Sequence, residues 1–259
     1  MLAENGTCDV KHILMKVIVN SIFQINMNEV LGDQRQVNNT ENGTITKNTL
    51  KYTKPSIVKI LYQMARDVDQ LFTRGQINYW TDGGTILGCV RHKGLIPWDD
   101  DIDLCIKLDD EPKLLALRPT LETRGYDLVA YKKPFGYKLF PMNNSLPLPP
   151  GRLGRYPFCD MFLMEKQDGR YVPCHEKPRK RWPNEFYLEE EVDNLERRPF
   201  GDLSLNCPGN AENYLTRFYG ENWNTEGVTQ EMDHLQKVFL EPVKFRLKNE
   251  HFLPAMPFN

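Results

Sequence analysis

The chain has 259 residues, of which 40% are hydrophobic and 26% are charged. That is enough apolar material for one sizeable domain or two small ones around a core, which argues against disorder of the whole chain. The 33 lysines and arginines nearly balance the 35 aspartates and glutamates, and the net charge of -2 gives no positive field to hold a nucleic-acid backbone. We therefore expect no nucleic-acid polymer as a partner.

Targeting signals are weak in this sequence. The most apolar run, residues 13–23, contains Lys16 and Asn20 and is not followed by a small-residue cleavage pattern, so we predict neither a transmembrane helix nor a signal peptide. Glycosylation sequons, which are typical of lumenal or extracellular proteins, begin at Asn5, Asn38, Asn42 and Asn143. For a eukaryotic source, we therefore expect a location in the Golgi or ER lumen of the secretory pathway.

A flexible segment precedes the compact part of the chain. Residues 26–50 are dominated by Asn, Gln, Thr and Gly, which is typical of a linker or loop. We therefore expect a partly flexible N-terminal segment over residues 1–50 and a folded domain over residues 51–259. This domain begins with residues 55–72, where apolar side chains recur with the 3.6-residue period and Pro55 suits the first turn, which predicts an amphipathic helix.

Short strands and helices follow this first helix. Residues 77–81 form a β-rich run that ends near a pair of glycines, and residues 85–91 then predict a short helix. Alternation of polar and apolar residues predicts a strand over residues 101–107. Other segments with strand or helix patterns are the candidate strands 126–131, 136–140 and 158–164 and the candidate helix 211–219. This order predicts an α+β fold with a small mixed β-sheet flanked by helices.

Two stretches are predicted to lie on the surface. The five prolines between residues 141 and 157 predict a long surface loop, because proline cannot donate to a continuous strand ladder. The charged stretch over residues 175–201 predicts a solvated surface rather than a phosphate-binding patch. Between them, Asp168 and Gly169 suit a tight hairpin turn.

The cysteines lack the paired spacing of a zinc site. Cys89, Cys105 and Cys159 lie inside apolar segments, so we expect them to be small core residues. Cys174 and Cys207 lie in loop-like sequence and stay possible disulfide partners.

An acidic cluster is the most informative feature of the sequence. Four aspartates occur within five positions, and they are Asp99, Asp100, Asp101 and Asp103. Because strand side chains alternate, Asp101 and Asp103 project from the same face about 7 Å apart, and their carboxylates can converge on one divalent ion. Ile102 and Leu104 would point into the core and hold the pair rigid. We therefore predict a metal site here, in preference to a solvated acidic loop.

Magnesium or manganese explains this cluster better than calcium or zinc. An EF-hand loop beginning at Asp99 would need Gly at its sixth position and Glu at its twelfth, where the chain has Leu104 and Asp110. Ligands that are all oxygen favour Mg²⁺ or Mn²⁺ over zinc. Mg²⁺ bound by one or two carboxylates commonly completes its shell with substrate phosphates, which predicts a phosphorylated substrate such as a nucleotide diphosphate.

A glycine turn lies just upstream of the acids. Gly83, Gly84 and Thr85 follow a predicted strand and open a predicted helix, so backbone N–H groups can face a phosphate with the Thr85 hydroxyl beside them. Arg91 would offer forked donors to a phosphoryl group. His92 is as consistent with a hydrogen-bonding surface residue as with a catalytic one. We assign these five residues to phosphate or substrate binding.

Together, the Gly-Thr turn, the Arg-His pair and the run IPWDDDID resemble the LicD family, which includes bacterial phosphorylcholine transferases and the animal fukutin and fukutin-related proteins. The resemblance is dense over residues 79–106 and extends thinly to residues 158–162 and 219–223. The last of these segments fits a functional role and a plain helix-ending turn equally well. The resemblance implies a nucleotidyltransferase-like fold, in which a DxD strand and a glycine turn flank a divalent metal.

The resemblance also implies roles for individual residues. Asp101 and Asp103 would be the DxD acids, Asp160 would be the third metal-binding and catalytic acid, and Asp99 and Asp82 would support them. The family moves a phospho-alcohol, such as phosphocholine or ribitol phosphate, from a CDP-linked donor to a glycan or glycoprotein hydroxyl. The implied activity is that of a phosphotransferase of class EC 2.7, in which Asp160 accepts the proton of the acceptor.

Two other functions stay open at this point. A glycosyltransferase would also use a DxD motif to hold a metal ion and a nucleotide diphosphate, but it would release UDP from a UDP-sugar, whereas the phosphotransferase would release CMP. A non-catalytic member of the same fold would bind a glycan without turnover. The presence of all three expected metal acids favours an enzyme.

Overall fold

The computed structural model describes residues 50–131, 136–150 and 154–258. The predicted N-terminal segment lies almost wholly outside these residues, as do the sequons at Asn5, Asn38 and Asn42. Asn143 is exposed. The lumenal location stays a prediction without structural support.

Helix α2 spans Pro55–Arg74 and confirms the first predicted helix. Its apolar side chains recur every three or four residues, so one stripe of the helix is buried, including Leu61, Val68 and Phe72. The N–H of Gly75 donates to the carbonyl of Leu71 at 2.8 Å where the helix ends. This helix lines the largest hydrophobic cluster of the domain.

The central sheet is mixed, as predicted. Its main path has the strand order β1-β2-β7-β4-β3. The bounds of these strands are β1 Tyr79–Thr81, β2 Ile102–Lys107, β3 Tyr126–Tyr131, β4 Gly136–Pro141 and β7 Cys159–Gln167. Strands β2 and β7 run parallel, whereas the other pairs along this path are antiparallel. Strands β8 (Arg170–Pro173) and β9 (Tyr187–Leu188) extend the sheet, and Asp168 and Gly169 form the predicted turn between β7 and β8.

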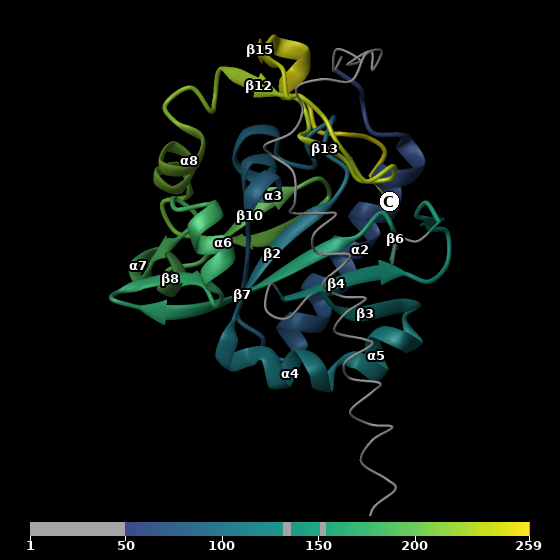
Figure 1. Ribbon diagram of the computed structural model, residues 1–259, viewed down its shortest axis with the longest axis vertical. Coiled ribbons are helices and arrows are strands. Elements are labelled where there is room, and N and C mark those ends of the chain that lie inside the picture. Colours follow the sequence, from purple (N-terminus) through teal and green to yellow (C-terminus); the bar gives the residue numbers. More distant parts are fainter. Residues whose placement is uncertain (1–49, 132–135, 151–153, 259) are drawn as a thin grey trace, which may run out of the picture. The chain divides into compact units, whose positions relative to one another are not determined.

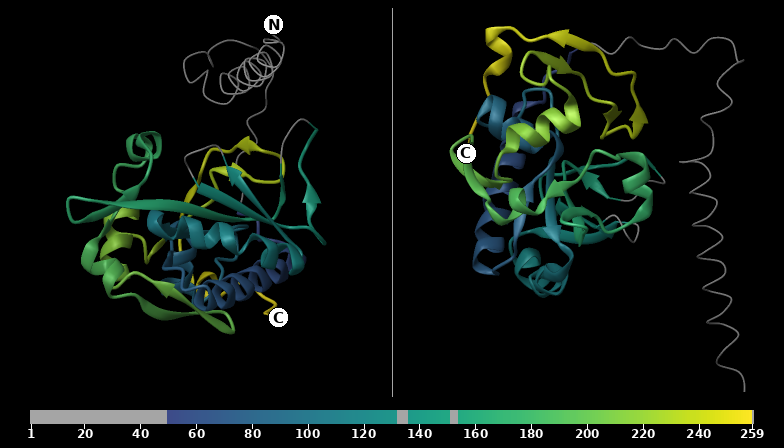
Figure 2. Two further views of the ribbon diagram at one scale, coloured as in Figure 1. Left: turned by 90° about the horizontal axis from the view of Figure 1, so that it is seen from below. Right: turned by 90° about the vertical axis from the view of Figure 1, so that its left-hand side faces the viewer.

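Side chains of β2 alternate between two hydrophobic clusters. Ile102, Leu104 and Ile106 belong to the cluster that contains α2, whereas Cys105 belongs to a second cluster with Trp80. Figure 2 shows α2 with α4 (Glu111–Ala116) and α5 (Arg118–Thr123) on one face of the sheet. The opposite face is therefore the one that Asp103 shares with Cys105.

The remaining elements are short. The helices are α3 Gly83–Leu87, a π-helical turn η1 Gly88–His92, η2 Leu108–Asp110, α6 Glu176–Arg181, α7 Glu189–Asp193, α8 Ala211–Tyr219 and η3 Asn249–Phe252. The two-stranded pairs are β5 Leu146–Pro147 with β6 Arg155–Tyr156, β10 Glu196–Phe200 with β11 Leu203–Cys207, β12 Glu226–Val228 with β15 Lys244–Arg246, and β13 Met232–Asp233 with β14 Val238–Phe239. In Figure 1 the strand β13 lies close to the start of β2. Within the described residues, no helix combines the length and apolar character that crossing a membrane requires.

The two stretches predicted to be surface are more ordered than expected. The proline-rich segment contains the β5–β6 pair, and Tyr156 beside it is buried. The charged stretch contains Tyr187, Val192 and Phe200, which are all buried. Charged side chains of the stretch, such as Lys180 and Arg181, are exposed as predicted, whereas the apolar residues between the charges pack into the two cores.

The cysteines in the described part of the chain are all free thiols. Cys89, Cys105 and Cys159 are buried in the core, as predicted. Cys207 is also buried, because it lies at the end of β11 rather than in a loop, and it does not pair with Cys174. The possible disulfide between Cys174 and Cys207 is therefore not formed.

Candidate active site

Three of the predicted acids meet where the parallel strands begin. Asp103 of β2 lies directly beside Asp160 of β7 in the strand register, and Asp101 precedes β2 on the same face. One carboxylate oxygen from each of the three lies within 4.8 Å of the other two. Ile102 and Leu104 are buried against α2, as the alternation predicted.

The glycine turn lies directly against these acids. Gly83 has a φ of +50°, and a Cβ atom on it would lie only 2.9 Å from Asp103 Oδ2. A Cβ atom on Gly84 would overlap the carboxylate of Asp99. Because neither position has room for a side chain, the two glycines let the main chain approach the acids closely.

Hydrogen bonds fix the turn to the DxD strand. The Thr85 hydroxyl oxygen accepts a hydrogen bond from the backbone N–H of Asp103 at 2.9 Å, and the N–H of Asp82 donates to the carbonyl of Asp103 at 3.0 Å. The carboxylate of Asp82 accepts hydrogen bonds from the hydroxyls of Tyr187 and, at 2.7 Å, Tyr214. Thr85 and Asp82 therefore support the acids by positioning the backbone around them.

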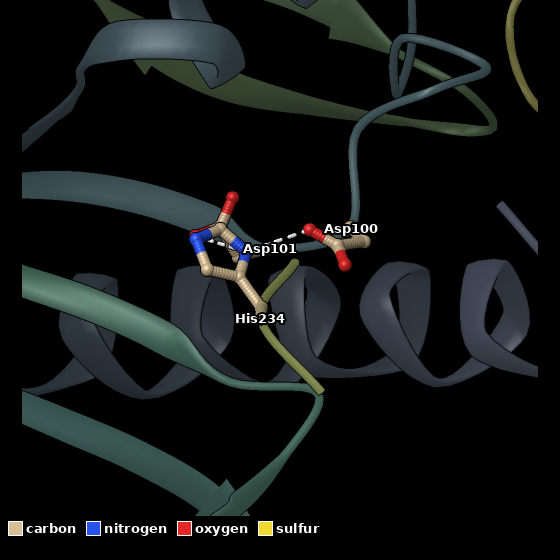
Figure 3. Close-up of side chains that lie close together, drawn as sticks. All are labelled: Asp100, Asp101 and His234. Atoms are coloured by element: carbon tan, nitrogen blue, oxygen red, sulfur yellow. Dashed lines mark hydrogen bonds and ion pairs between the residues drawn. The ribbon is translucent and has the colours of Figure 1, made fainter. Parts of the chain in front are cut away.

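Two cationic side chains contact the acids. Lys138 of β4 lies opposite Asp160 in the antiparallel register, and its ammonium contacts both carboxylate oxygens, Oδ2 at 2.6 Å. His234 reaches the site from the turn between β13 and β14, and its Nδ1 lies 2.7 Å from Asp100 Oδ1 and 3.5 Å from Asp101 Oδ2. Figure 3 shows the imidazole ring directed toward both carboxylates.

Burial and crowding change the proton affinity of these groups. Burial raises the pKa of Asp101 to about 6, and the charges of Asp100 and Asp160 act in the same direction. Burial and the neighbouring carboxylates also hold the pKa of Asp103 and of Asp99 well above the usual range. Burial alone would lower the pKa of His234, but the carboxylates of Asp101 and Asp100 raise it to about 9. The arrangement therefore favours the uptake of positive charge.

The donor set fits a hard divalent cation. Asp101, Asp103 and Asp160 offer only oxygen atoms, and these are close enough to coordinate one ion. The backbone beside them has glycine where a side chain would fill the space next to Asp103. A second group of Asp100, Asp101 and His234 is equally compact, but in the structure its members already bond to one another.

Arg91 and His92 make contacts away from the acids. Arg91 donates hydrogen bonds to the carbonyls of Trp223 and, at 3.0 Å, Glu226, and burial lowers its pKa to about 10. The ring of His92 is buried edge-on against Trp98, and burial followed by the charge of Arg91 lowers its pKa to about 3. Arg91 thus holds the segment after α8 in place. A phosphate-binding role for Arg91 or His92 stays a prediction.

Sequence reasoning missed the cations of the site. A signal for Lys138 was present, because it is the one charged residue among apolar neighbours in the predicted strand 136–140, which was expected to join the same sheet as the strand of Asp160. No local signal identifies His234, because the hairpin that holds it is placed by contacts with residues more than a hundred positions away.

Comparisons with known proteins identify the family of the domain. A family model described as "LicD/FKTN/FKRP, nucleotidyltransferase domain" matches residues 76–210. The chain belongs to the LicD family. All of the predicted acids of this LicD domain, together with its glycine turn, lie within the matched residues.

Individual relatives of the LicD domain differ in how much of the chain they match. An uncharacterised protein of Rickettsia prowazekii is 29% identical over 201 residues, which are 76% of this chain and 69% of the relative. The human ribitol 5-phosphate transferase FKRP is 38% identical over 68 residues, or 26% of this chain and 14% of that protein. The lipopolysaccharide cholinephosphotransferase LicD of Haemophilus influenzae is 52% identical over 40 residues, which are 15% of each chain. The likeness to the two named transferases thus covers only a small part of either.

Proposed function

We propose that this LicD-family chain is a metal-dependent transferase that moves a phospho-alcohol from a CDP-linked donor to a hydroxyl of a glycan. The observation that carries the proposal is the meeting of Asp101, Asp103 and Asp160 beside the Gly83–Gly84 turn. The names of two relatives, a ribitol 5-phosphate transferase and a cholinephosphotransferase, support a phospho-alcohol as the transferred group.

Asp101, Asp103 and Asp160 would hold Mg²⁺ or Mn²⁺, with Asp99 close by at the glycine turn. When bound, the ion would neutralise charge on the diphosphate as the leaving group departs. The turn contributes by letting the backbone lie against the acids, so the donor can approach them without meeting a side chain. Thr85 keeps the DxD strand at this distance through its bond to the N–H of Asp103.

The transfer itself needs an acceptor that loses a proton. The acceptor oxygen would bond to the phosphorus that carries the alcohol, and the bond from that phosphorus to the CMP oxygen would break, so that CMP leaves. In this scheme Asp160 takes the proton of the acceptor hydroxyl. Lys138 would orient Asp160, because its ammonium contacts both oxygens of that carboxylate.

Nucleotide release tests the proposal. The purified chain would be incubated with Mg²⁺ or Mn²⁺, a glycan acceptor, and CDP-ribitol, CDP-choline or a UDP-sugar, and the nucleotide product would be measured. We expect CMP from a CDP-linked donor and none from the Asp103→Asn variant. Release of UDP alone would instead identify a glycosyltransferase, and glycan binding without any nucleotide release would identify a non-catalytic member of the family.

A further inference from the structure

The β13–β14 hairpin carries a second cation to the acidic site. His234 anchors the turn of this hairpin, because its Nδ1 contacts Asp100 at 2.7 Å and its ring centroid lies 5.1 Å from that of Phe158. The N–H of Lys237 donates to the carbonyl of Asp233 at 2.7 Å, which closes the turn. The contact of His234 with Asp100 holds one end of the turn, and the backbone bond of Lys237 holds the other. Anchoring His234 at the acids therefore also holds Lys237 near them.

Lys237 shares an aromatic ring with Lys138. The ammonium of Lys237 lies 4.7 Å from the ring centroid of Phe158, and that of Lys138 lies 3.7 Å from the same centroid. Such contacts stabilise a cation. Two ammonium groups on one ring nevertheless repel each other, and burial followed by the charge of Lys138 lowers the pKa of Lys237. The carboxylates of Asp160, Asp101 and Asp100 raise the pKa of Lys237 and offset part of this repulsion.

The two lysines differ in their anionic partners. Lys138 is paired with Asp160. In the part of the chain that the structure describes, no carboxylate oxygen lies within 4.0 Å of the ammonium of Lys237. Lys237 is half-buried, contacts an aromatic ring and has no ion pair, and it lies near acids that fit a divalent ion. Such a cation is suited to bind an anion that enters the site together with the divalent ion.

We infer that Lys237 binds the diphosphate of the nucleotide-linked donor, beside Phe158 and Lys138. This inference rests on the proposed function for the identity of the donor. A diphosphate fits better than a carboxylate ligand, because it carries more negative charge and more oxygens, so it can contact a divalent ion through some of them and an ammonium group through others. The hairpin is then a part of the donor site that lies beyond the residues of the family match.

Binding of inorganic pyrophosphate and of CDP, each with Mn²⁺, tests the inference by calorimetry. We expect Lys237→Gln to weaken both by about tenfold or more, and Lys237→Arg to stay within about threefold of the unaltered protein. Binding of Mn²⁺ alone should not weaken in either variant, because the charge of Lys237 acts on Asp160 and Asp101 and its removal in Lys237→Gln leaves these acids more attractive to a cation. Lys180→Gln is a matched control, since Lys180 is an exposed lysine paired with Glu176 on α6.

The outcomes separate this inference from the proposed function. Pyrophosphate binding by Lys237→Gln as tight as that of the unaltered protein would overturn the inference, and so would an equal loss in Lys180→Gln. Loss of Mn²⁺ binding in Lys237→Gln would also overturn it, because the lysine would then support the metal site rather than the diphosphate. If pyrophosphate binding depends on Lys237 but no CDP-linked donor is turned over, the inference stands and the proposed function fails. Urea unfolding of each variant checks that the hairpin change has not unfolded the domain.

Discussion

Carboxylates on the two sides of the glycine turn are stabilised in different ways. Asp82, just before the turn, accepts hydrogen bonds from the hydroxyls of Tyr187 and Tyr214, and burial and the neighbouring Asp82 raise the pKa of the adjacent Glu185 to about 9, so that this carboxyl is neutral at pH 7. Asp101 and Asp103, across the turn, have other carboxylates among their near neighbours, and their pKa values are raised. A carboxylate with fixed neutral donors needs no ion. Carboxylates that crowd one another are stabilised by a cation that can enter and leave.

This difference indicates that Asp82 stabilises the fold, whereas Asp101 and Asp103 serve the reaction. Removing a charge from the crowded acids relieves repulsion, whereas removing Asp82 leaves two buried hydroxyls without an acceptor. Activity and stability should therefore respond in opposite ways to substitutions only a few ångströms apart. The predictions below test that contrast.

The largest effect is expected from Asp103→Asn. The variant should lose more than about 100-fold in transfer rate and in Mn²⁺ affinity, because one of three ligands becomes a neutral amide. Its free energy of unfolding without metal should equal or exceed that of the unaltered protein, since a buried and crowded carboxyl has been replaced by a similar uncharged group. Calorimetry with Mn²⁺ and urea unfolding measure the two quantities.

Asp109→Asn is a suitable control for that experiment. Asp109 lies on η2 directly after β2, is exposed, and belongs to neither group of close carboxylates. It should bind Mn²⁺ and turn over substrate as the unaltered protein does. Full activity of Asp103→Asn would remove the basis for the metal site.

Asp82→Ala should produce the converse result. The buried hydroxyls of Tyr187 and Tyr214 would lose their acceptor, and we expect a loss of roughly 2 to 4 kcal/mol in the free energy of unfolding. The folded fraction should still bind Mn²⁺, because Asp82 is not one of the three ligands. Urea unfolding followed by Mn²⁺ titration measures both. A stable variant that had lost its metal would place Asp82 in the metal site and erase the contrast.

Local pattern was enough to predict the two acids of the DxD strand. Alternation along residues 101–107 placed Asp101 and Asp103 on one face and Ile102 in the core, and the single acid in residues 158–164 marked Asp160. The first inference depends on the strand period alone, whereas the role of Asp160 came from the resemblance to the LicD family. The sequence likewise predicted the glycine turn, because two adjacent glycines between a strand and a helix indicate main chain that another group must approach closely.

Long-range contacts explain what the sequence could not reveal. His234 and Lys237 reach the acids only because a short hairpin folds back over the sheet, and its strands have two residues each, too few for a periodic signal. Cys207 was misplaced for a similar reason. Its segment contains Asn206 and precedes a proline, which suggested a loop, yet pairing with β10 makes it the last residue of a buried strand.

A pH effect of intermediate size should distinguish the crowded acids from Asp82. The pKa of Asp101 is raised from its usual value near 3.8 to about 6, so the folded, metal-free protein gains stability from this group at low pH and loses it as the pH rises through about 6. The raised pKa of His234, about 9, acts in the same direction, because its contribution is present below 6.5 and lost as the pH rises through 9. Bound metal replaces the protons on the acids.

The stabilisation by Mn²⁺ should therefore grow with pH. From the pKa of Asp101 alone, Mn²⁺ affinity should be about fourfold weaker at pH 5.5 than at pH 7.5, and the raised pKa of Asp103 adds to the difference. The increase in Tm on addition of Mn²⁺, measured by scanning fluorimetry across this range, reports it. An increase in Tm that does not depend on pH would mean that the acids are already ionised without metal.

The smallest effect is expected where the glycine turn supports the DxD strand. Thr85→Val keeps the shape of the side chain but removes the acceptor for the N–H of Asp103, so we expect a loss of about 1 kcal/mol in the free energy of unfolding. Because that bond positions Asp103, Mn²⁺ affinity should fall by about tenfold as well. Thr123→Val is the control, since the hydroxyl of Thr123 donates only to the exposed carbonyl of Thr120 one turn earlier. If Thr85→Val loses stability but keeps full affinity, the acids hold their geometry without the turn, and the close approach of Gly83 and Gly84 must serve the donor rather than the metal.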